Sequence, residues 1–318
     1  MKIMVFDVPA EFGGALTILK QYYKRAVEDK ENEWIFVIGK PELCEKENVR
    51  IIRLPWTKKS WLHRLWFDNF YAKKLIKKHN PDKVISLQNT TVKAKGYFQE
   101  LYVHQALIFS EKRFSLKENK KFWIYQNIIS KMIFKSIKKA DCVIVQTKWM
   151  KDSIINTLGK EEEKIKVIAP DAEFSEGISY KKAPEINFFY PSGKGIHKNH
   201  SAIYRAVEIL KEKGYTNFNL YLTLEKPEKE QSENIKFLGY IPKDEVNNYY
   251  QKSALLFASY IESFGLPLLE ARTYGCPIIA SDCSFSREIL EEYENAQFFD
   301  PFSPKDLAEK MIEYIEAY

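Results

Sequence analysis

Short apolar runs alternate with helical patterns along the first half of the chain. Runs rich in Val, Ile and Phe are typical of buried strands, whereas apolar residues spaced three or four apart indicate amphipathic helices. The expected strands are 3–6, 34–38, 49–52, 84–87, 101–103 and 142–145, and the expected helices lie near 15–28, 61–78, 121–139 and from 148 onwards. Such alternation predicts a parallel sheet with helices on both faces. We therefore expect residues 1–169 to form one Rossmann-like domain.

Turn-forming residues, among them Pro170, Gly177 and Pro184, interrupt this periodicity. We expect a linker at 170–185 and a second Rossmann-like domain at 186–318. Its expected strands are 186–190, 218–222, 235–238, 254–257 and 277–280, and its expected helices lie near 199–213, 243–251 and 304–316. The expected fold is thus α/β, with two doubly wound domains facing a central cleft. Ligands should bind in that cleft, because the carboxyl ends of both sheets would line it.

Composition supports a folded protein. The 318 residues are 45% hydrophobic and 29% charged, which allows two sizeable cores and argues against disorder. No run of eighteen apolar residues occurs, and the apolar N-terminal stretch is too short for a secretory signal. The four cysteines are far apart, without a metal-binding doublet. We expect reduced thiols and a cytoplasmic location.

The net charge of +6 conceals an asymmetry. Residues 1–169 carry 33 Lys and Arg against 19 Asp and Glu, whereas residues 170–318 carry 16 against 24. Aromatic residues are interleaved with the basic ones at 56–78 and 112–139, a pattern that suits an anionic membrane surface. A core-packed helix with a solvated basic face explains much of the same pattern, so both interpretations stay open. We expect no nucleic-acid partner, because no recognised module of that kind is visible.

Two glutamates, Glu262 and Glu270, bracket a Gly/Pro turn and the expected start of a helix. A helix that begins between Ser263 and Pro267 leaves its first backbone N–H groups unpaired, and these suit a phosphate or a developing negative charge. Gly265 permits close approach of a ligand, and the two carboxylates can accept hydrogen bonds from hydroxyls. The alternative is an ordinary capped helix with an acidic first turn.

The stretch from Ala258 to Asp282 resembles the donor-site signature of glycosyltransferase family 4, a family of retaining group 1 enzymes with the GT-B fold. Its two glutamates fall on that family's E-x7-E pattern. The resemblance implies that Glu270 holds the ribose hydroxyls of a nucleotide sugar and that Glu262 holds hydroxyls of the transferred sugar. It also implies that the backbone around the turn contacts the donor, through residues Ser263, Phe264, Gly265 and Leu266.

Two further segments of the second half carry the same resemblance. A basic loop with Lys194 and Lys198 follows the expected strand 186–190, and lysines there could neutralise a diphosphate leaving group without a metal. Lys198 falls on the family's pyrophosphate-binding lysine. The usual arginine is absent, and Lys194 is its nearest substitute, although the two residue types bind phosphate differently. Gly239 and Tyr240 match the segment that runs beside the nucleobase, or else form a plain strand-to-helix turn.

Two positions of the first half complete the expected site. Gly13 and Gly14 open a helix after the first strand, where their amides could approach a phosphate. They form no G-x-G-x-x-G fingerprint, but they match the family's Gly-rich loop that faces the donor pyrophosphate. His104 ends the expected strand 101–103 and resembles the family's histidine near donor sugar and acceptor, with Gln105 in place of the usual Asp. The catalytic candidates are therefore His104, Lys198 and Glu262.

The function implied by the resemblance is hexosyl transfer with retention of anomeric configuration, with residues 1–169 on the acceptor side and residues 186–318 binding the nucleotide-sugar donor. The donor would be a nucleotide sugar, UDP-linked in preference to GDP- or dTDP-linked, and the acceptor a hydroxyl of a surface polysaccharide or lipid-linked glycan. We expect no metal and no cofactor, since no D-x-D motif or metal-ligand cluster occurs and the departing phosphate oxygen can act as base. The protein could also lie peripherally on the inner face of the membrane. The alternatives are a GT-B-shaped sugar-nucleotide epimerase and a noncatalytic protein that binds nucleic acid or membrane.

Overall fold

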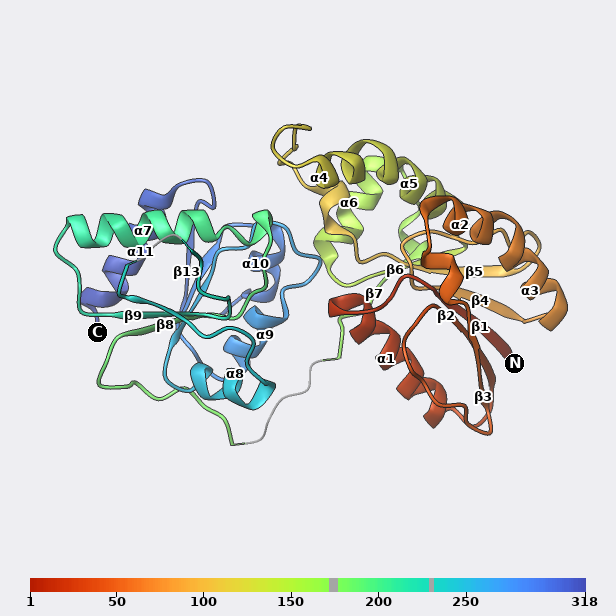
Figure 1. Cartoon of the computed structure of the whole chain (residues 1–318), viewed down its shortest axis with the longest axis horizontal. Helices are drawn as coiled ribbons and strands as arrows, with labels where there is room; N and C mark the ends of the chain where they lie inside the picture. Colours follow the sequence, from red (N-terminus) through yellow and green to blue (C-terminus); the bar gives the residue numbers. More distant parts are fainter. Residues whose placement is uncertain (172–176, 229–231) are drawn as a thin grey trace. The chain divides into compact units, whose positions relative to one another are not determined.

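The computed structural model describes residues 1–171, 177–228 and 232–318, and the chain forms two compact units, Met1–Asp171 and Ala172–Tyr318 (Figure 1). Residues 172–176 of the expected linker 170–185 lie outside the described residues. The later part of that linker is attached to the second unit. The Tyr180 N–H donates to Tyr274 O at 2.7 Å, and the Lys181 N–H donates to Gln251 O at 2.7 Å.

The first unit is built on one parallel sheet with strand order β3-β2-β1-β4-β5-β6-β7. Its strands are β1 (Lys2–Asp7), β2 (Glu33–Ile38), β3 (Val49–Arg53), β4 (Lys83–Ser86), β5 (Phe98–Tyr102), β6 (Cys142–Val145) and β7 (Ile165–Val167). Strand β7 was not among the expected strands. It lies at the sheet edge, and of its three residues only Ile165 is buried, so it lacks the apolar run that marks the others.

Helices cover both faces of this sheet. They are α1 (Gly13–Glu28), α2 (Trp61–Trp66), α3 (Ala72–His79), α4 (Lys120–Ile124), α5 (Ser130–Lys139) and α6 (Lys148–Leu158), with 3₁₀ turns at Pro55–Lys58, Ala106–Phe109 and Glu162–Lys164. Alternate residues of β1 point to opposite faces, as the strand period of two requires. Ile3 and Val5 join the core beneath α1, whereas Met4 and Phe6 join the core beneath α3.

The two long helices expected at 61–78 and 121–139 are each interrupted by a π-helical turn, at Phe67–Tyr71 and Tyr125–Ile129. Helices are thus present over both expected ranges, and the sequence analysis did not anticipate the π-helical turns within them. A π turn adds a residue to one helical turn and changes which side chains face the neighbouring elements. The spacing of apolar residues does not reveal a π turn, because the chain is α-helical both before and after it.

The second unit repeats the architecture with strand order β10-β9-β8-β11-β12-β13, again parallel. Its strands are β8 (Asn187–Tyr190), β9 (Asn219–Leu222), β10 (Ile235–Phe237), β11 (Ala254–Phe257), β12 (Ile278–Ser281) and β13 (Ala296–Phe299). Its helices are α7 (His200–Glu212), α8 (Lys243–Tyr250), α9 (Leu266–Thr273), α10 (Ser284–Ile289) and α11 (Pro304–Glu316), with a 3₁₀ turn at Ile196–Lys198. Figure 1 shows α7 and α11 side by side along one face of the sheet, with α8 and α9 on the other. Strand β13 and the short helix α10 were not expected.

Both sheets reverse their strand order at one position, between β1 and β4 in the first unit and between β8 and β11 in the second. Connections leave such neighbouring strands toward opposite faces, which opens a crevice at their carboxyl ends where ligands bind. Asp7 ends β1 and Gln88 lies just beyond β4, whereas Ser192 and Ser259 lie just beyond β8 and β11. The fold therefore marks one ligand-binding position in each unit.

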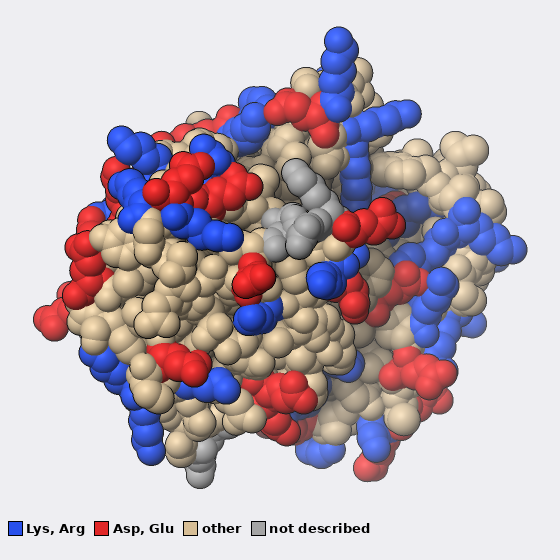
Figure 2. Space-filling model, turned by 60° about the vertical axis from the view of Figure 1, so that its left-hand side comes forward, with Lys and Arg blue, Asp and Glu red and all other residues tan. Residues whose placement is uncertain are grey.

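Acidic and basic residues are both present on the surface of the protein. Figure 2 shows acidic and basic side chains interspersed over the face that it presents, rather than gathered into one large patch of a single sign. Within residues 1–171, 177–228 and 232–318, no helix combines the length and the apolar character that crossing a membrane requires.

Candidate active site

Two of the expected catalytic residues, Lys198 and Glu262, form an ion pair, and both side chains are largely buried. Lys198 ends the 3₁₀ turn before α7, whereas Glu262 lies in the loop between β11 and α9. The two loops are also joined through the backbone, because the Tyr260 N–H donates to His197 O at 3.1 Å. Ser259 Oγ lies 2.7 Å from the carboxylate oxygen that Lys198 contacts. The pair therefore sits at the strand-order reversal of the second sheet.

Helix α9 begins directly after Gly265, close to the position expected from the sequence. Gly265 has a φ of 96°, a conformation that costs little only for glycine, and an added Cβ would lie 3.3 Å from Leu268 Cδ1. Pro267 occupies the first turn, where its missing N–H costs nothing. The helix start has no side-chain cap, so Ser263, Phe264 and Leu266 belong to a turn whose shape suits an anion.

The second glutamate of the pattern also has a lysine partner. The Glu270 carboxylate, largely buried on α9, pairs with the Lys243 ammonium at the start of α8. The sequence analysis singled out Glu270 but did not identify Lys243, although this lysine directly follows the Gly239 to Pro242 segment. Glu262 thus lies in the loop before α9 and Glu270 lies on α9 itself. Each carboxylate forms an ion pair with a lysine from a different element.

Lys194, Gly239 and Tyr240 line one pocket of about 440 Å³ in the second unit. Gly239 has a φ of 66°, and the Tyr240 side chain is 92% exposed. Ser192 also lines this pocket, and its Oγ lies 2.9 Å from Nε2 of the half-buried His200. Burial, and secondarily the Lys198 charge, lowers the pKa of His200 to about 4. Among the described residues, the lining of this pocket does not include the Lys198–Glu262 pair or Glu270.

Gly13 and Gly14 form the start of α1, just beyond the carboxyl end of β1. Gly13 has a φ of 62°, and a Cβ added at either glycine would meet no other atom within 4 Å. The helix start has no side-chain cap. Open space above uncapped amides is the geometry that the sequence analysis expected for a phosphate-facing turn.

His104 follows β5, as expected, and is held by Asn89. The His104 backbone N–H donates to Asn89 Oδ1 at 2.8 Å, so the Asn89 amide nitrogen must face His104 Nε2, 3.0 Å away. Nε2 therefore accepts, and in the neutral ring Nδ1 carries the proton. Nδ1 is buried without a partner among the described residues, and burial lowers the pKa of His104 to about 4. The neighbouring Gln105 side chain instead accepts from the Leu107 N–H at 3.3 Å.

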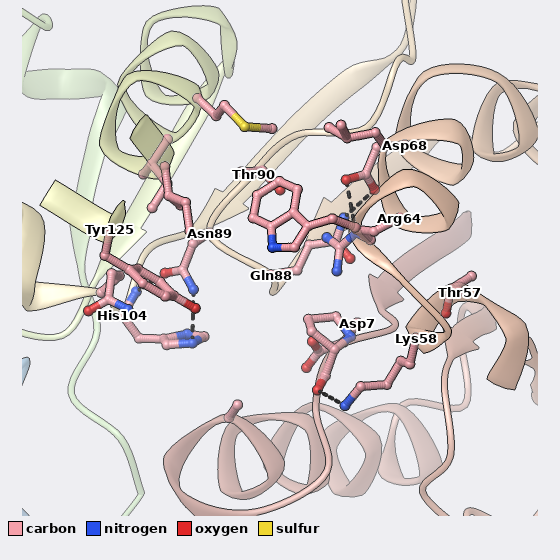
Figure 3. Close-up of a pocket in the computed structure, with 18 of the residues that line it drawn as sticks. Asp7, Thr57, Lys58, Arg64, Asp68, Gln88, Asn89, Thr90, His104 and Tyr125 are labelled. Atoms are coloured by element: carbon pink, nitrogen blue, oxygen red, sulfur yellow. Dashed lines mark hydrogen bonds and ion pairs between the residues drawn. The ribbon is translucent and has the colours of Figure 1, made fainter. Parts of the chain in front are cut away.

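His104 lines a second pocket of about 530 Å³, which lies entirely within the first unit (Figure 3). Figure 3 shows Tyr125, Asn89 and His104 on one side of it and Arg64, Asp68 and Lys58 on the other, with Asp7 between them. Most of these residues were missed by the sequence analysis. The available signal was a polar residue at or just beyond the end of an apolar strand, as with Asp7 at the end of β1 and Gln88 two residues after β4.

Two basic residues counted in the 56–78 segment belong to this pocket rather than to a free basic surface. Arg64 Nε donates to Asp68 Oδ2 at 2.9 Å, and Lys58 Nζ lies 2.6 Å from Glu11 Oε2. Burial raises the pKa of Asp68 even though the Arg64 charge opposes it. The charges of Lys58 and Arg64 are therefore already neutralised within the first unit.

Asp7 is the least satisfied charged group of the pocket. Neither carboxyl oxygen makes a well-formed hydrogen bond to a described residue, and the side chain is buried. Burial raises the pKa of Asp7 to about 7, against the opposing effects of the Arg64 charge, the Ala10 backbone N–H and the Lys58 charge. A buried carboxyl without a partner at the end of a central strand is typical of a group that meets a ligand.

Comparisons with known proteins identify related sequences and related folds. Residues 179–318 match the family model of the group 1 glycosyl transferases. The O-antigen chain mannosyltransferase RfbU of Salmonella typhimurium is 26% identical over 200 residues, which cover 59% of this chain and 56% of RfbU. The matched region thus spans about half the length of that curated relative.

Among solved structures, sucrose-phosphate synthase from Thermosynechococcus elongatus superimposes with a TM-score of 0.70 at 15% identity, covering 99% of this chain and 90% of that one. The Anabaena protein HepE, solved with UDP-glucose, superimposes with a TM-score of 0.62 at 17% identity, covering 100% and 90%. These likenesses confirm the expected fold of two Rossmann-like parallel-sheet units. The chain therefore has the GT-B fold, and its residues 179–318 are similar to the group 1 glycosyl transferases.

Proposed function

We propose that this protein is a glycosyltransferase that moves a sugar from a nucleotide-sugar donor to a hydroxyl of a surface polysaccharide or lipid-linked glycan, with retention as in family 4. The observation that carries the proposal is the Lys198–Glu262 pair, which lies at the strand-order reversal of the unit that is similar to the group 1 glycosyl transferases. The pair brings a cation suited to diphosphate and a carboxylate suited to sugar hydroxyls to one place.

The proposed mechanism depends on stabilising the leaving group. The Lys198 ammonium and the uncapped amides at the start of α9 bind the departing diphosphate, with Lys194 as an additional cation. Once the diphosphate attracts Lys198, Glu262 is free to accept hydrogen bonds from the transferred sugar. Glu270 does the same for the ribose, and Gly239 and Tyr240 lie beside the base. Preorganised charges of this kind usually make the largest contribution to catalysis.

We propose that three residues of the first unit, His104, Gly13 and Gly14, also take part in the reaction. His104 is neutral at physiological pH and lines the pocket of the first unit, so in this proposal it positions hydroxyls rather than accepting their protons. The amides of Gly13 and Gly14 approach the donor diphosphate. The departing phosphate oxygen takes the acceptor's proton, which needs no protein base. Because lysines and amides supply the positive charge, we propose turnover without a metal, and unchanged rates in excess chelator would support this.

The donor base and sugar are a narrower proposal. HepE was solved with UDP-glucose, which supports a UDP-sugar in preference to a GDP- or dTDP-sugar, whereas RfbU is named as a mannosyltransferase. The acceptor proposal follows the O-antigen chain named for RfbU.

The decisive experiment incubates the protein with UDP-, GDP- and dTDP-linked hexoses, with and without a glycan acceptor, and measures released nucleoside diphosphate. Mass spectrometry and NMR of the product then identify the linkage and the anomeric configuration. A new sugar nucleotide formed without acceptor would indicate an epimerase instead. Binding of no nucleotide sugar at all, with salt-sensitive binding of RNA or DNA, would indicate a noncatalytic nucleic-acid-binding protein.

We also propose that the first unit contacts an anionic membrane surface. Exposed apolar side chains gather on and after α2, with exposed fractions of 53% for Trp61, 77% for Leu62, 50% for Trp66 and 64% for Phe70. Exposed lysines flank them at 59, 73 and 74. Apolar side chains bordered by lysine suit the interface of anionic lipid, and such contact would place the enzyme at a lipid-linked acceptor.

A further inference from the structure

We propose that Tyr250 is a positioning residue of the donor site. Its buried hydroxyl holds the Glu270 carboxylate in the orientation that accepts hydrogen bonds from a ribose, whereas Lys243, the other partner of this carboxylate, is the group that the nucleotide displaces. The inference rests on the proposed function, because it concerns how the ribose contact of that function is prepared. All three residues lie within the second unit, so it depends on no arrangement of the two units.

Helix α8 carries both partners of Glu270, Lys243 at its first position and Tyr250 at its last. Residues seven apart are separated by almost two full helical turns, so the two side chains leave the same face of α8. The Lys243 ammonium forms an ion pair with Glu270 of α9, which directs this face toward the carboxylate. Helices α8 and α9 cover the same face of the second sheet (Figure 1). Two side chains of one helix thus converge on one carboxylate.

The Tyr250 side chain is completely buried and is fixed by its neighbours. Its ring centroid lies 5.6 Å from that of Phe189 and 5.7 Å from that of Tyr274. Tyr274 follows Glu270 by about one helical turn, and its N–H donates to Glu270 O at 3.0 Å. The Tyr250 carbonyl accepts from Cys276 Sγ at 3.1 Å. These contacts hold Tyr250 against the end of α9 that follows Glu270.

The Tyr250 hydroxyl lacks the well-formed hydrogen bond that a buried tyrosine normally makes. It approaches the Glu270 carboxylate without ideal alignment, and it has no other such partner within the described residues. Burial, and then the charge and proximity of Glu270, raise the pKa of Tyr250 well above its usual value. The hydroxyl therefore keeps its proton and acts toward a carboxylate as a donor. Hydrogen bonds of a binding site are often poorly aligned until the ligand binds, so we expect this one to tighten with the nucleotide.

The two partners of Glu270 differ in their freedom to move. The Lys243 side chain is 47% exposed and flexible, so water can replace Glu270 as its partner. The Tyr250 hydroxyl has no access to water, and it lies on the axis of its ring, so a ring flip does not move it. Glu270 is itself 15% exposed, which leaves part of it open to a ligand. A ribose therefore takes the place of Lys243, while Tyr250 keeps the carboxylate oriented.

The test compares nucleotides that differ only in the ribose hydroxyls. Calorimetry measures binding of UDP, GDP and their 2′,3′-dideoxy analogues to the full chain and to Tyr250→Phe. We expect Tyr250→Phe to weaken the tighter-binding ribonucleotide about fivefold, because Glu270 is no longer held toward the two hydroxyls. Binding of its dideoxy analogue should weaken less than 1.5-fold, since that analogue makes no hydrogen bond to Glu270. Equal losses for both ligands, or no loss for the ribonucleotide, would overturn the inference.

The matched control is Tyr274→Phe, which removes the hydroxyl of a neighbouring buried tyrosine. That hydroxyl lies 3.4 Å from Asn247 Oδ1 rather than at Glu270, so affinity for both ligands should stay within 1.5-fold. In transfer assays, Tyr250→Phe should raise the donor KM about fivefold with kcat within twofold, because the ribose contact is the same in the ground state and the transition state. A loss of kcat alone would contradict a role in holding the ribose.

A measurement without nucleotide separates this inference from the proposed function. Thermal unfolding is recorded for Tyr250→Phe, for Glu270→Ala and for the double variant. Tyr250→Phe should lower the unfolding temperature less in Glu270→Ala than in the unchanged protein, because the partner of the hydroxyl is already gone. Equal decreases would overturn the inference even in a protein that transfers sugar. Unequal decreases in a protein that binds no nucleotide would keep the contact but refute the proposed function, and the ribose role with it.

Discussion

Lys198 and Glu262, which approach from opposite sides of the β8/β11 reversal, are each other's charge partners. Their side chains are largely buried, and the two loops that carry them are joined by the Tyr260 N–H to His197 O hydrogen bond. In the proposed function, a diphosphate must therefore compete with Glu262 for the Lys198 ammonium. The ion pair also offsets part of the desolvation free energy that each buried charge would cost if it had no partner.

Replacing Lys198 by Ala should lower the transfer rate by about 10²–10³, the usual cost of removing one group that stabilises a developing anion. Binding of nucleoside diphosphate should weaken in parallel, as measured by calorimetry. Lys211→Ala, an exposed lysine of α7, is the matched control and should leave both quantities within twofold. Normal turnover of Lys198→Ala would remove this residue from the site.

Replacing Glu262 by Gln should separate diphosphate binding from transfer. The amide no longer competes for the Lys198 ammonium, so we expect nucleoside diphosphate to bind about three- to tenfold more tightly. Sugar transfer should nevertheless fall at least tenfold, because the amide accepts hydrogen bonds from the transferred sugar more weakly than a carboxylate. Weaker diphosphate binding in Glu262→Gln would contradict the competition between the two ligands of Lys198.

Glu270→Ala should weaken binding of both nucleoside diphosphate and nucleotide sugar about tenfold, since two ribose hydroxyls lose a charged acceptor. Lys243→Ala removes only the partner of that carboxylate, and it should change affinity by no more than about threefold. Isothermal titration of both variants checks the difference. Equal losses would show that the ion pair, rather than the free carboxylate, supports the nucleotide.

Asp7→Asn should stabilise the first unit increasingly as pH rises. The pKa of Asp7 is 3.8 in the unfolded chain and about 7 in the folded one, so the folded state holds a proton that the unfolded state has released across that window. Its contribution to stability therefore falls as pH rises from about 4 to 7, by up to about 4 kcal/mol. Asn cannot ionise and does not lose stability in this way.

The measurement for this carboxyl is the thermal unfolding temperature of both proteins at pH 5 and at pH 8. The advantage of Asp7→Asn should be larger at pH 8, whereas Asp152→Asn, which changes an exposed carboxylate of α6, should show the same difference at both values. A pH-independent difference for Asp7→Asn would mean that this carboxyl is not held in its protonated form by burial.

The apolar face of α2 predicts binding to vesicles. Leu62→Glu combined with Phe70→Glu should reduce cosedimentation with phosphatidylglycerol vesicles at least tenfold, because two exposed apolar side chains become acidic. Mutating the lysines at 59, 73 and 74 to Ala should act in the same direction, with each contributing about 1 kcal/mol. The control is the pair Lys211→Ala and Lys213→Ala in the second unit. Binding that survives both sets of changes would exclude this face.

Local sequence determined most of the elements and the turn on which the proposed donor site depends. Alternating apolar runs and helical periods gave nearly every strand and helix, because buried strands and amphipathic helices leave their period in the residues themselves. The E-x7-E stretch likewise contained its own turn chemistry, with Gly265 at a positive φ and Pro267 in the first helical turn. Short or half-exposed elements such as β7 and α10 left too little period to be recognised.

Only the tertiary structure decided which charges meet. Lys198 and Glu262 are 64 residues apart, and their pairing follows from β8 and β11 lying side by side, which no local pattern states. The same holds for the pocket of the first unit, where strand order places Asp7 beside Gln88 and two π turns direct Asp68 and Tyr125 inward. Burial then raises the pKa of Asp7 and lowers that of His104. Burial is a property of the packed fold, so the sequence could name candidate residues but could not assign their charge or their partners.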